Sequence, residues 1–281
     1  MQEHWEKYYT HEQIKKLQEI ELDILKVFID ICEKLNLTYF AYGGTLLGIE
    51  KYQGFIPWDD DVDVALTRES YEKFIKYAPD ILPDEYFIQN PYNCSECPYP
   101  YTKLRRSGTR YVEYSNRNVN IKTGIYIDIY PVDRIPDDEK LRKKQYKNVR
   151  KWIMLYVCRQ VPLYDKSVPG RFGWAKRIAK WIICNIARFL PQSYCINKID
   201  YYMTLYNSTD SKRYAALNSP NFNNIYLNLF PLRDAIFENY SIKIPGDHRT
   251  HLRMRYGDYS SLPPEDQRYG HIPYILDFGD V

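Results

Sequence analysis

The sequence predicts an α+β protein, in which a mixed β-sheet flanked by helices is followed by a helical stretch. Short runs of branched and aromatic residues between turn signals predict several strands before residue 135. From residue 136 onward, long segments repeat apolar residues at helical spacing. In this chain of 281 residues, we therefore expect a core with the mixed sheet over residues 1–135. A helical insertion and a C-terminal segment that folds back on the core should occupy residues 136–281, in one compact unit.

The first part of the chain alternates helices and strands. Apolar residues at helical spacing predict a helix over residues 11–35, and Thr10 with Gln13 three residues later predicts its N-terminal cap. The aromatic run at 37–42 predicts a strand that stops at a pair of glycines. The same patterns predict a helix at 45–52, a strand around 61–66 and a helix at 69–77.

Further strands precede the helical stretch, and a mixed segment follows it. The segment 103–114 carries Ser107-Gly108 at its centre and is interpreted as a hairpin. The last stretch, 236–281, mixes a short strand, a basic helix and proline-rich loops. Other strands are predicted at 86–91 and 124–133, and helices at 137–160, 171–190 and 197–207.

Composition excludes several classes of protein. The formal net charge of +3 is nearly balanced, which argues against a dedicated nucleic-acid binder. The charged N-terminus carries no secretory signal, and no apolar run is long enough to cross a bilayer. We therefore expect a cytoplasmic protein whose cysteines are reduced. Cys94 and Cys97 form a single CxxC, which leaves a zinc site open.

An acidic segment, "GFIPWDDDVDVAL", places Asp59, Asp60, Asp61 and Asp63 where the chain enters a buried strand. Aspartate is depleted in strands, and neighbouring carboxylates repel one another. Alternation along a strand would point Asp61 and Asp63 to the same side, where a cation between them removes the repulsion. Oxygen ligands of this kind suit Mg²⁺, Mn²⁺ or Ca²⁺.

An EF-hand calcium loop and a solvated acidic loop both fit the acidic segment less well. An EF-hand loop starting at Asp59 would need Gly at its sixth position and Glu at its twelfth, where the chain has Val64 and Ser70. A solvated acidic loop conflicts with the apolar residues on both sides, which fix the segment in a core. Metal binding is therefore the favoured interpretation.

Two more features belong to the same expected site. Gly43 and Gly44 lie between a strand and a helix, where amides without a nearby Cβ can bind a phosphate. Asp128 is a single charge among branched residues and is expected within about 5 Å of the Asp61 and Asp63 carboxylates, the range of strong coupling. Asp133 is the alternative third carboxylate.

These motifs resemble the LicD (fukutin-related) family of phosphotransferases, which has a nucleotidyltransferase-like fold. The resemblance covers most of the chain, and its "GG…GFIPWDDDVD" block is the most specific part. Where the family commonly has a basic residue and a histidine, this chain has Lys51 and Tyr52, so a role for that histidine is in doubt. The matching segments are "YGGTLLGIEKYQGFIPWDDDVDVAL", "KLRRSGTRYVE", "GIYIDIYPVD" and "YGDYSSLPPEDQRYGH".

The resemblance implies transfer of a phospho-alcohol, with phosphocholine the first candidate, from a CDP-activated donor such as CDP-choline. The acceptor would be a hydroxyl of a cell-surface glycan, such as lipopolysaccharide or a teichoic-acid precursor, and CMP would be released. Ribitol and glycerol remain open as the alcohol. Two rivals are a nucleotidyltransferase that releases pyrophosphate and a non-catalytic binder that has kept the fold.

The resemblance also assigns roles to residues. Asp59, Asp61, Asp63 and Asp128 would hold Mg²⁺ or Mn²⁺, and Asp128 would complete the ion site or take the acceptor's proton. Lys103, Arg105 and Arg106, where they face the cleft, would hold the diphosphate, the alternative being a solvated edge strand. Trp58 and Tyr130 are candidates for a choline cage, although either could simply pack. The expected substrate-binding residues are Gly43, Gly44, Thr45, Lys51, Trp58, Lys103, Arg105, Arg106 and Tyr130.

Residues 174–190 form a basic amphipathic segment rich in tryptophan. Such helices lie on anionic membrane surfaces, and a lipid-linked acceptor at the inner membrane face would explain one here. The alternative is a helix whose apolar face packs on the core and whose basic face is solvated. The apolar face carries Trp174, Ile178, Trp181, Ile182, Ile186 and Phe189, and the other face carries Lys176, Arg177, Lys180 and Arg188.

Overall fold

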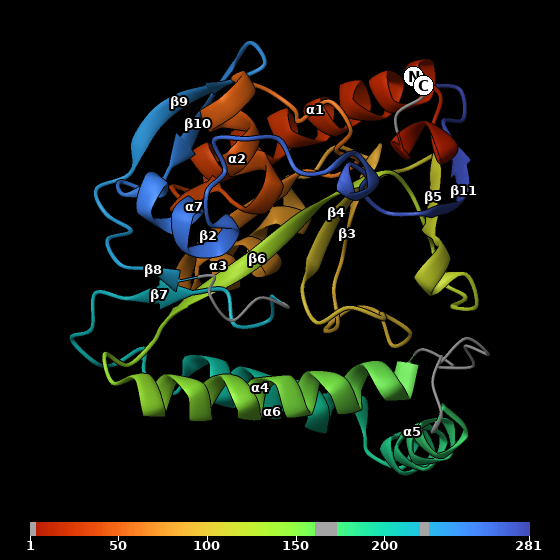
Figure 1. Cartoon of the computed structure of the whole chain (residues 1–281), viewed down its shortest axis with the longest axis vertical. Coiled ribbons are helices and arrows are strands. Elements are labelled where there is room, and N and C mark those ends of the chain that lie inside the picture. Colours follow the sequence, from red (N-terminus) through yellow and green to blue (C-terminus); the bar gives the residue numbers. More distant parts are fainter. Residues whose placement is uncertain (1–3, 161–172, 220–224) are drawn as a thin grey trace.

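The computed structural model describes residues 4–160, 173–219 and 225–281 (Figure 1). Helices pack around a mixed sheet, and a separate layer of helices lies beneath it, as expected for an α+β fold. Within these ranges, no helix combines the length and the apolar character needed to cross a membrane.

The main sheet has its two acidic strands side by side. Its order is β1-β2-β6-β4-β3, in which β2 and β6 run parallel and the other neighbours antiparallel. The short strands β7 and β8 extend from the far end of β6. These strands are β1 (Tyr39–Ala41), β2 (Asp63–Thr67), β3 (Tyr86–Gln89), β4 (Thr102–Arg106), β6 (Tyr126–Arg134), β7 (Tyr214–Ala215) and β8 (Ile225–Tyr226).

Helix α1 (His11–Lys34) covers the apolar face of this sheet. It begins at the predicted capping box, in which Thr10 and Gln13 exchange hydrogen bonds. Its buried residues join Val64 and Ile127 of the central strands in one core. Because side chains alternate along a strand, Asp63 and Asp128 face the opposite side of the sheet. The other helices around the sheet are α2 (Gly43–Tyr52), α3 (Arg68–Tyr77) and α7 (His248–Tyr256).

The predicted hairpin at residues 103–114 is wrong. The chain turns at Gly108, whose φ is +79°. However, β4 lies between β3 and β6, so both of its edges are paired with other strands and none is free for the next strand. The following strand, β5 (Arg110–Glu113), pairs instead with β11 (Pro273–Asp277) from the returning C-terminal segment. A turn signal alone does not show which strand a chain will pair with.

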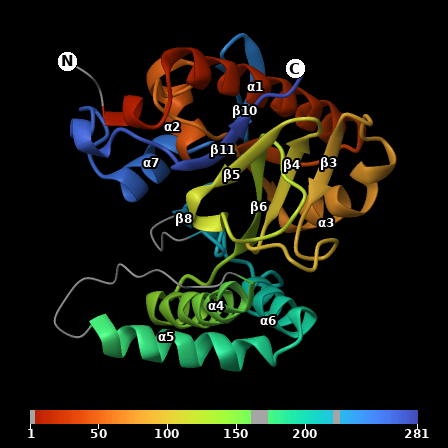
Figure 2. The same ribbon diagram turned by 90° about the vertical axis from the view of Figure 1, so that its right-hand side faces the viewer.

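Three helices form the lower layer, as Figures 1 and 2 show. α4 (Glu139–Gln160) and α6 (Gln192–Thr204) share a core of their own, and α5 (Gly173–Arg188) packs along α4. The remaining elements are β9 (Arg233–Phe237), β10 (Tyr240–Ile244) and the 3-10 helices His4–Lys7, Ala78–Asp80, Tyr114–Asn116 and Glu265–Gln267.

Asp133 joins the sheet to the helices through a buried ion pair. Arg68 donates two hydrogen bonds to its carboxylate, at 2.8 and 2.6 Å, and also reaches Asp200 of α6 at 3.3 Å. Asn207 donates a third bond to Asp133 at 2.7 Å. The Asp133 carboxylate therefore binds Arg68 and Asn207 and has a structural role. Asp128 remains as the candidate third carboxylate.

We predict that Asp133→Ala lowers the free energy of unfolding by about 3–5 kcal/mol, because it leaves Arg68 without its buried partner. Urea denaturation measures this change. Asp234→Ala breaks the exposed Lys243–Asp234 pair, of 2.6 Å, and serves as the matched control with an expected cost below about 1 kcal/mol. Equal effects of the two substitutions would contradict a structural role for Asp133.

Candidate active site

Three carboxylates meet at the polar face of the sheet. Asp61, Asp63 and Asp128 each offer an oxygen within 4.8 Å of the others. Asp63 and Asp128 are directly opposite in the parallel register of β2 and β6. The expectation that Asp128 lies within about 5 Å of the other two is confirmed. Asp61 precedes β2 rather than lying in it, so the strand is shorter than predicted.

Backbone hydrogen bonds fix this cluster in place. The Asp63 amide donates to the Thr45 hydroxyl at 2.8 Å, and the Asp63 carbonyl accepts from the Tyr42 amide at 3.0 Å. The Asp128 amide donates to the Val62 carbonyl at 2.8 Å. Thr45, expected to bind substrate, is thus buried and positions Asp63.

The two glycines make room for the carboxylates. Gly43 begins α2 with φ +55°, and a Cβ there would lie 1.9 Å from Asp63 Oδ2. A Cβ on Gly44 would lie 2.6 Å from Asp59 Oδ2. The positive φ favours glycine at Gly43, and a Cβ at either position would displace an acidic side chain from the start of the helix. The first-turn amides of a helix have no partner within the helix, as a phosphate site would need.

The carboxylates at this position repel one another when they are ionised, and the pKa values of several are raised. Burial, together with Asp60 and Asp128 nearby, raises the pKa of Asp61 to about 6. Burial and neighbouring carboxylates also raise the pKa of Asp59 and of Asp63 well above the usual range. Glu21 of α1 is buried nearby, and burial followed by the charge of Asp61 raises its pKa as well. A cation at this position would relieve the repulsion.

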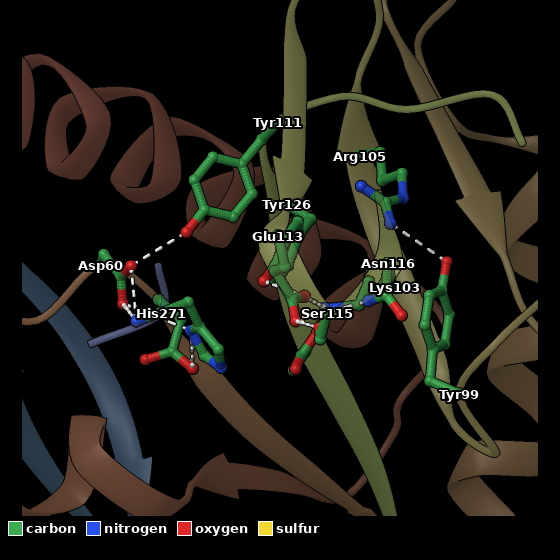
Figure 3. Close-up of polar contacts among 12 residues, drawn as sticks. Asp60, Tyr99, Lys103, Arg105, Tyr111, Glu113, Ser115, Asn116, Tyr126 and His271 are labelled. Atoms are coloured by element: carbon green, nitrogen blue, oxygen red, sulfur yellow. Dashed lines mark hydrogen bonds and ion pairs between the residues drawn. The ribbon is translucent and has the colours of Figure 1, made fainter. Parts of the chain in front are cut away.

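One cation of the chain itself already reaches the cluster. The Lys103 ammonium, on a side chain 1% exposed, lies 2.8 Å from Asp128 and 3.6 Å from Glu113 (Figure 3). It also lies over the Tyr126 ring, 3.2 Å from the centroid. Burial alone would raise the pKa of Glu113, but Lys103 and His271 outweigh it and lower it to about 2. Asp128 is therefore paired with a cation of the chain itself.

Arg105 lies on the same face of β4 as Lys103, and its guanidinium is 4.9 Å from the centroid of the same Tyr126 ring, whereas Arg106 is on the other face. Arg105 is buried and donates to Gln89 at 2.8 Å, to the Gly124 carbonyl at 2.6 Å and to the Tyr99 hydroxyl at 3.1 Å (Figure 3). Arg106 follows it on the strand and lies over the Tyr86 ring at 4.8 Å. Alternation separates these two arginines onto opposite faces, so they cannot hold one diphosphate together. The solvated edge strand is equally wrong, because β4 is internal.

Lys51 lines a cleft and is bound there by the chain itself. Its ammonium donates to the carbonyls of Tyr259 and Ser260 at 2.7 and 3.1 Å, which holds the loop before residue 265 against α2. Tyr130 donates to Asp128 at 3.3 Å, and its ring lies between those of Tyr42 and Tyr101 at 5.1 and 4.6 Å.

A cleft of about 530 Å³ adjoins the acidic cluster. Gly44 and Asp59 form part of its wall, and Trp58 contributes an aromatic surface that the Arg268 guanidinium approaches to 5.6 Å. Asp59 lines this cleft and is outside the group of three close carboxylates. The opposite wall is formed by Tyr256, Asp258, Tyr259, Ser261, Leu262, Pro263, Pro264 and Gln267.

Sequence reasoning missed the role of His271. Its Nδ1 lies 3.3 Å from Asp60 and 3.9 Å from Asp61, and its backbone amide donates to Asp60 (Figure 3). Asp60 also accepts from the Tyr9 and Tyr111 hydroxyls at 2.5 and 2.9 Å. Burial alone would lower the pKa of His271, but Asp60 and Asp61 raise it well above the usual range. His271 ends the "YGDYSSLPPEDQRYGH" motif, which was the available signal.

Arg255 of α7 was also missed. Its guanidinium lies over the Tyr42 ring at 5.2 Å, and its charge partly offsets the raised pKa of Asp63. Nothing in the motifs distinguished it from the other basic residues of the C-terminal segment.

Comparison with known proteins places these motifs in a family. Residues 36–164 match the model of the LicD/FKTN/FKRP nucleotidyltransferase domain. The chain is 26% identical over 271 residues to the lipopolysaccharide cholinephosphotransferase LicD of Haemophilus influenzae, covering 94% of this chain and 98% of that protein. An uncharacterised protein of Rickettsia prowazekii is 32% identical over 126 residues, covering 44% of this chain and 45% of its own length.

Two substitutions should have opposite effects on the metal-free protein. Because the raised pKa means that Asp61 is destabilising when ionised, Asp61→Asn should raise the free energy of unfolding by roughly 2–3 kcal/mol at pH 7.5. Asp128→Asn should lower it by up to about 3–5 kcal/mol, because Lys103 loses its closest partner. Thermal and urea unfolding in EDTA measure both.

The pH dependence provides the control. The folded-state pKa of Asp61 is above its unfolded value, so the wild type gains stability as pH falls through about 6. The advantage of Asp61→Asn should therefore shrink at pH 4.5. An advantage that is independent of pH would contradict charge repulsion as its cause.

Proposed function

Because the chain belongs to the LicD family, we propose that it transfers phosphocholine from CDP-choline to a hydroxyl of a glycan and releases CMP. The observation that carries this proposal is the cluster of Asp61, Asp63 and Asp128, close in the chain to Asp59, which lines a cleft. The likeness to a lipopolysaccharide cholinephosphotransferase along nearly the whole of both chains supports the alcohol and the type of acceptor. A teichoic-acid precursor carries the same kind of hydroxyl and is the alternative acceptor.

The residues of the cluster fit Mg²⁺ or Mn²⁺. They offer only oxygen ligands, and burial together with mutual repulsion raises the pKa of Asp61 and Asp63, as expected where a cation is needed. Asp59 would complete the set from the side of the cleft. The ion, when bound, would neutralise charge on the phosphate oxygens.

The chain's own groups would bind the donor diphosphate. The amides at the start of α2, from Gly43 to Thr45, provide a helix N-terminus next to the carboxylates. Lys103 and His271 contribute positive charge on either side of the cluster. Despite burial, Asp60 and Asp61 raise the pKa of His271 well above its usual range, which favours a role as a cation over one as a proton acceptor. The acceptor's proton would then pass to a carboxylate, for which Asp59 and Asp128 are the candidates.

Aromatic rings near the cluster suit a quaternary ammonium group. Tyr101 and Tyr130 are partly exposed, and their tilted rings have centroids 4.6 Å apart. Tyr130 donates to Asp128, whereas Trp58 lines the cleft. Rings of this kind attract a choline headgroup through cation–π interactions. The Lys103 ammonium already occupies the space over the Tyr126 ring, so choline would bind on the solvent-facing side of the Tyr101 and Tyr130 rings.

A donor assay tests the proposal. We predict that the protein releases CMP from CDP-choline in the presence of a glycan acceptor, and that EDTA stops release until Mg²⁺ or Mn²⁺ is restored. With CTP, no pyrophosphate should appear. Consumption of CTP instead would identify a nucleotidyltransferase, and full activity without divalent metal would contradict the role of the carboxylates.

Substitution at the cluster tests the residues. Asp61→Asn and Asp63→Asn should lower turnover more than about tenfold, because each removes a charge that holds the cation. Asp234→Asn, at an exposed carboxylate of β9, is the matched control and should retain wild-type turnover. Circular dichroism would establish that the variants are folded. Turnover above about a tenth of wild type in both cluster variants would rule out a metal-binding role.

A further inference from the structure

Bulky apolar side chains of α5 face solvent rather than the protein. The exposed fraction is 50% for Ile178, 56% for Trp181, 58% for Ile186 and 87% for Phe189, which directly follows the helix. Their spacing puts them, with the 45% exposed Ile182, on one side of the helix. The alternative in which this apolar face packs on the core is therefore wrong for these residues. Trp174 and three of the basic residues have side chains outside the described part.

The other side of α5 attaches the helix to the rest of the molecule. Cys184 and Ala187 are buried against Cys158 of α4, with Leu155 and Ile183 beside them. Figure 2 shows α5 at the bottom edge of the molecule, beyond α4. The helix is thus held through Cys184 and Ala187 with Ile183 beside them, and the exposed apolar residues lie on its other side.

The charge of the chain is concentrated in the same region. Residues 140–199 contain fifteen Lys and Arg residues and one acidic residue, Asp165, which gives a formal charge of +14. The whole chain carries +3, so everything outside this region carries −11. Exposed basic residues of α4, the helix that carries α5, are Lys140, Lys143, Lys144, Lys147 and Lys151.

We propose that the exposed apolar face of α5, defined by Ile178, Trp181, Ile182, Ile186 and Phe189, docks on an anionic phospholipid membrane. Apolar side chains with a tryptophan would enter the interface between headgroups and acyl chains, while the surrounding positive charge attracts anionic headgroups. The face would thus lie on the membrane without crossing it.

Charge excludes the main alternative occupant. A second copy of this chain would bring two regions of +14 together, and their repulsion opposes association through this face. A nucleic acid would match the charge but would leave the apolar side chains in water. Only a surface that is both anionic and apolar complements both properties.

Vesicle binding by the full-length protein tests this proposal without requiring turnover. Co-sedimentation is measured with phosphatidylcholine vesicles and with vesicles that also contain phosphatidylglycerol. We expect binding to the anionic vesicles that weakens with added salt, together with a blue shift of tryptophan fluorescence. The double variant Ile186→Ser/Phe189→Ser should bind more than about tenfold more weakly, because each residue loses its burial in lipid.

Ile236→Ser is the matched control, since Ile236 of β9 is also 50% exposed but lies outside the basic region. It should bind vesicles like the wild type. The proposal is overturned if the wild type does not bind anionic vesicles, or if the double variant binds as tightly as the control. A dimer in sedimentation velocity that the double variant abolishes would identify a second copy as the occupant instead. None of these outcomes depends on the proposed transfer reaction.

Discussion

Repulsion among buried and half-buried carboxylates is the constraint on which the rest of the structure depends. Asp61, Asp63 and Asp128 offer oxygens within 4.8 Å of one another, and burial strengthens their repulsion. A fold maintains such an arrangement only where neighbouring elements fix it. Hydrogen bonds from β2 and β6 and the absence of a Cβ at Gly43 provide that support.

Distant parts of the chain supply the compensating charge. Lys103 from β4 pairs with Asp128, and His271 from the C-terminal segment lies between Asp60 and Asp61. Pairing of β11 with β5 returns that segment to the core, which brings His271 to Asp60 although 211 positions separate them. Electrostatics and topology therefore act together, because the C-terminal segment completes the surroundings of a site whose carboxylates all precede residue 130.

Local patterns in the sequence predicted the parts of this arrangement that depend on neighbouring residues. Alternation along β6 put Asp128 opposite its isoleucines, and the capping box set the start of α1. Partners far apart in sequence could not be predicted in this way. A turn at Gly108 does not show that β6 already pairs with β4, and a basic run does not show that Arg105 is buried against Gln89. The exposed face of α5 was also undecided, since amphipathicity alone does not identify which face is covered.

We propose that the cluster of Asp61, Asp63 and Asp128 binds a divalent cation, which would relieve this repulsion. The most direct test is a crystal grown with Mn²⁺ and measured for anomalous scattering at the manganese edge. The account predicts one or two anomalous peaks in contact with the oxygens of Asp61, Asp63 and Asp128, with Lys103 still beside the cluster. An empty cluster in a crystal that binds Mn²⁺ elsewhere would contradict it.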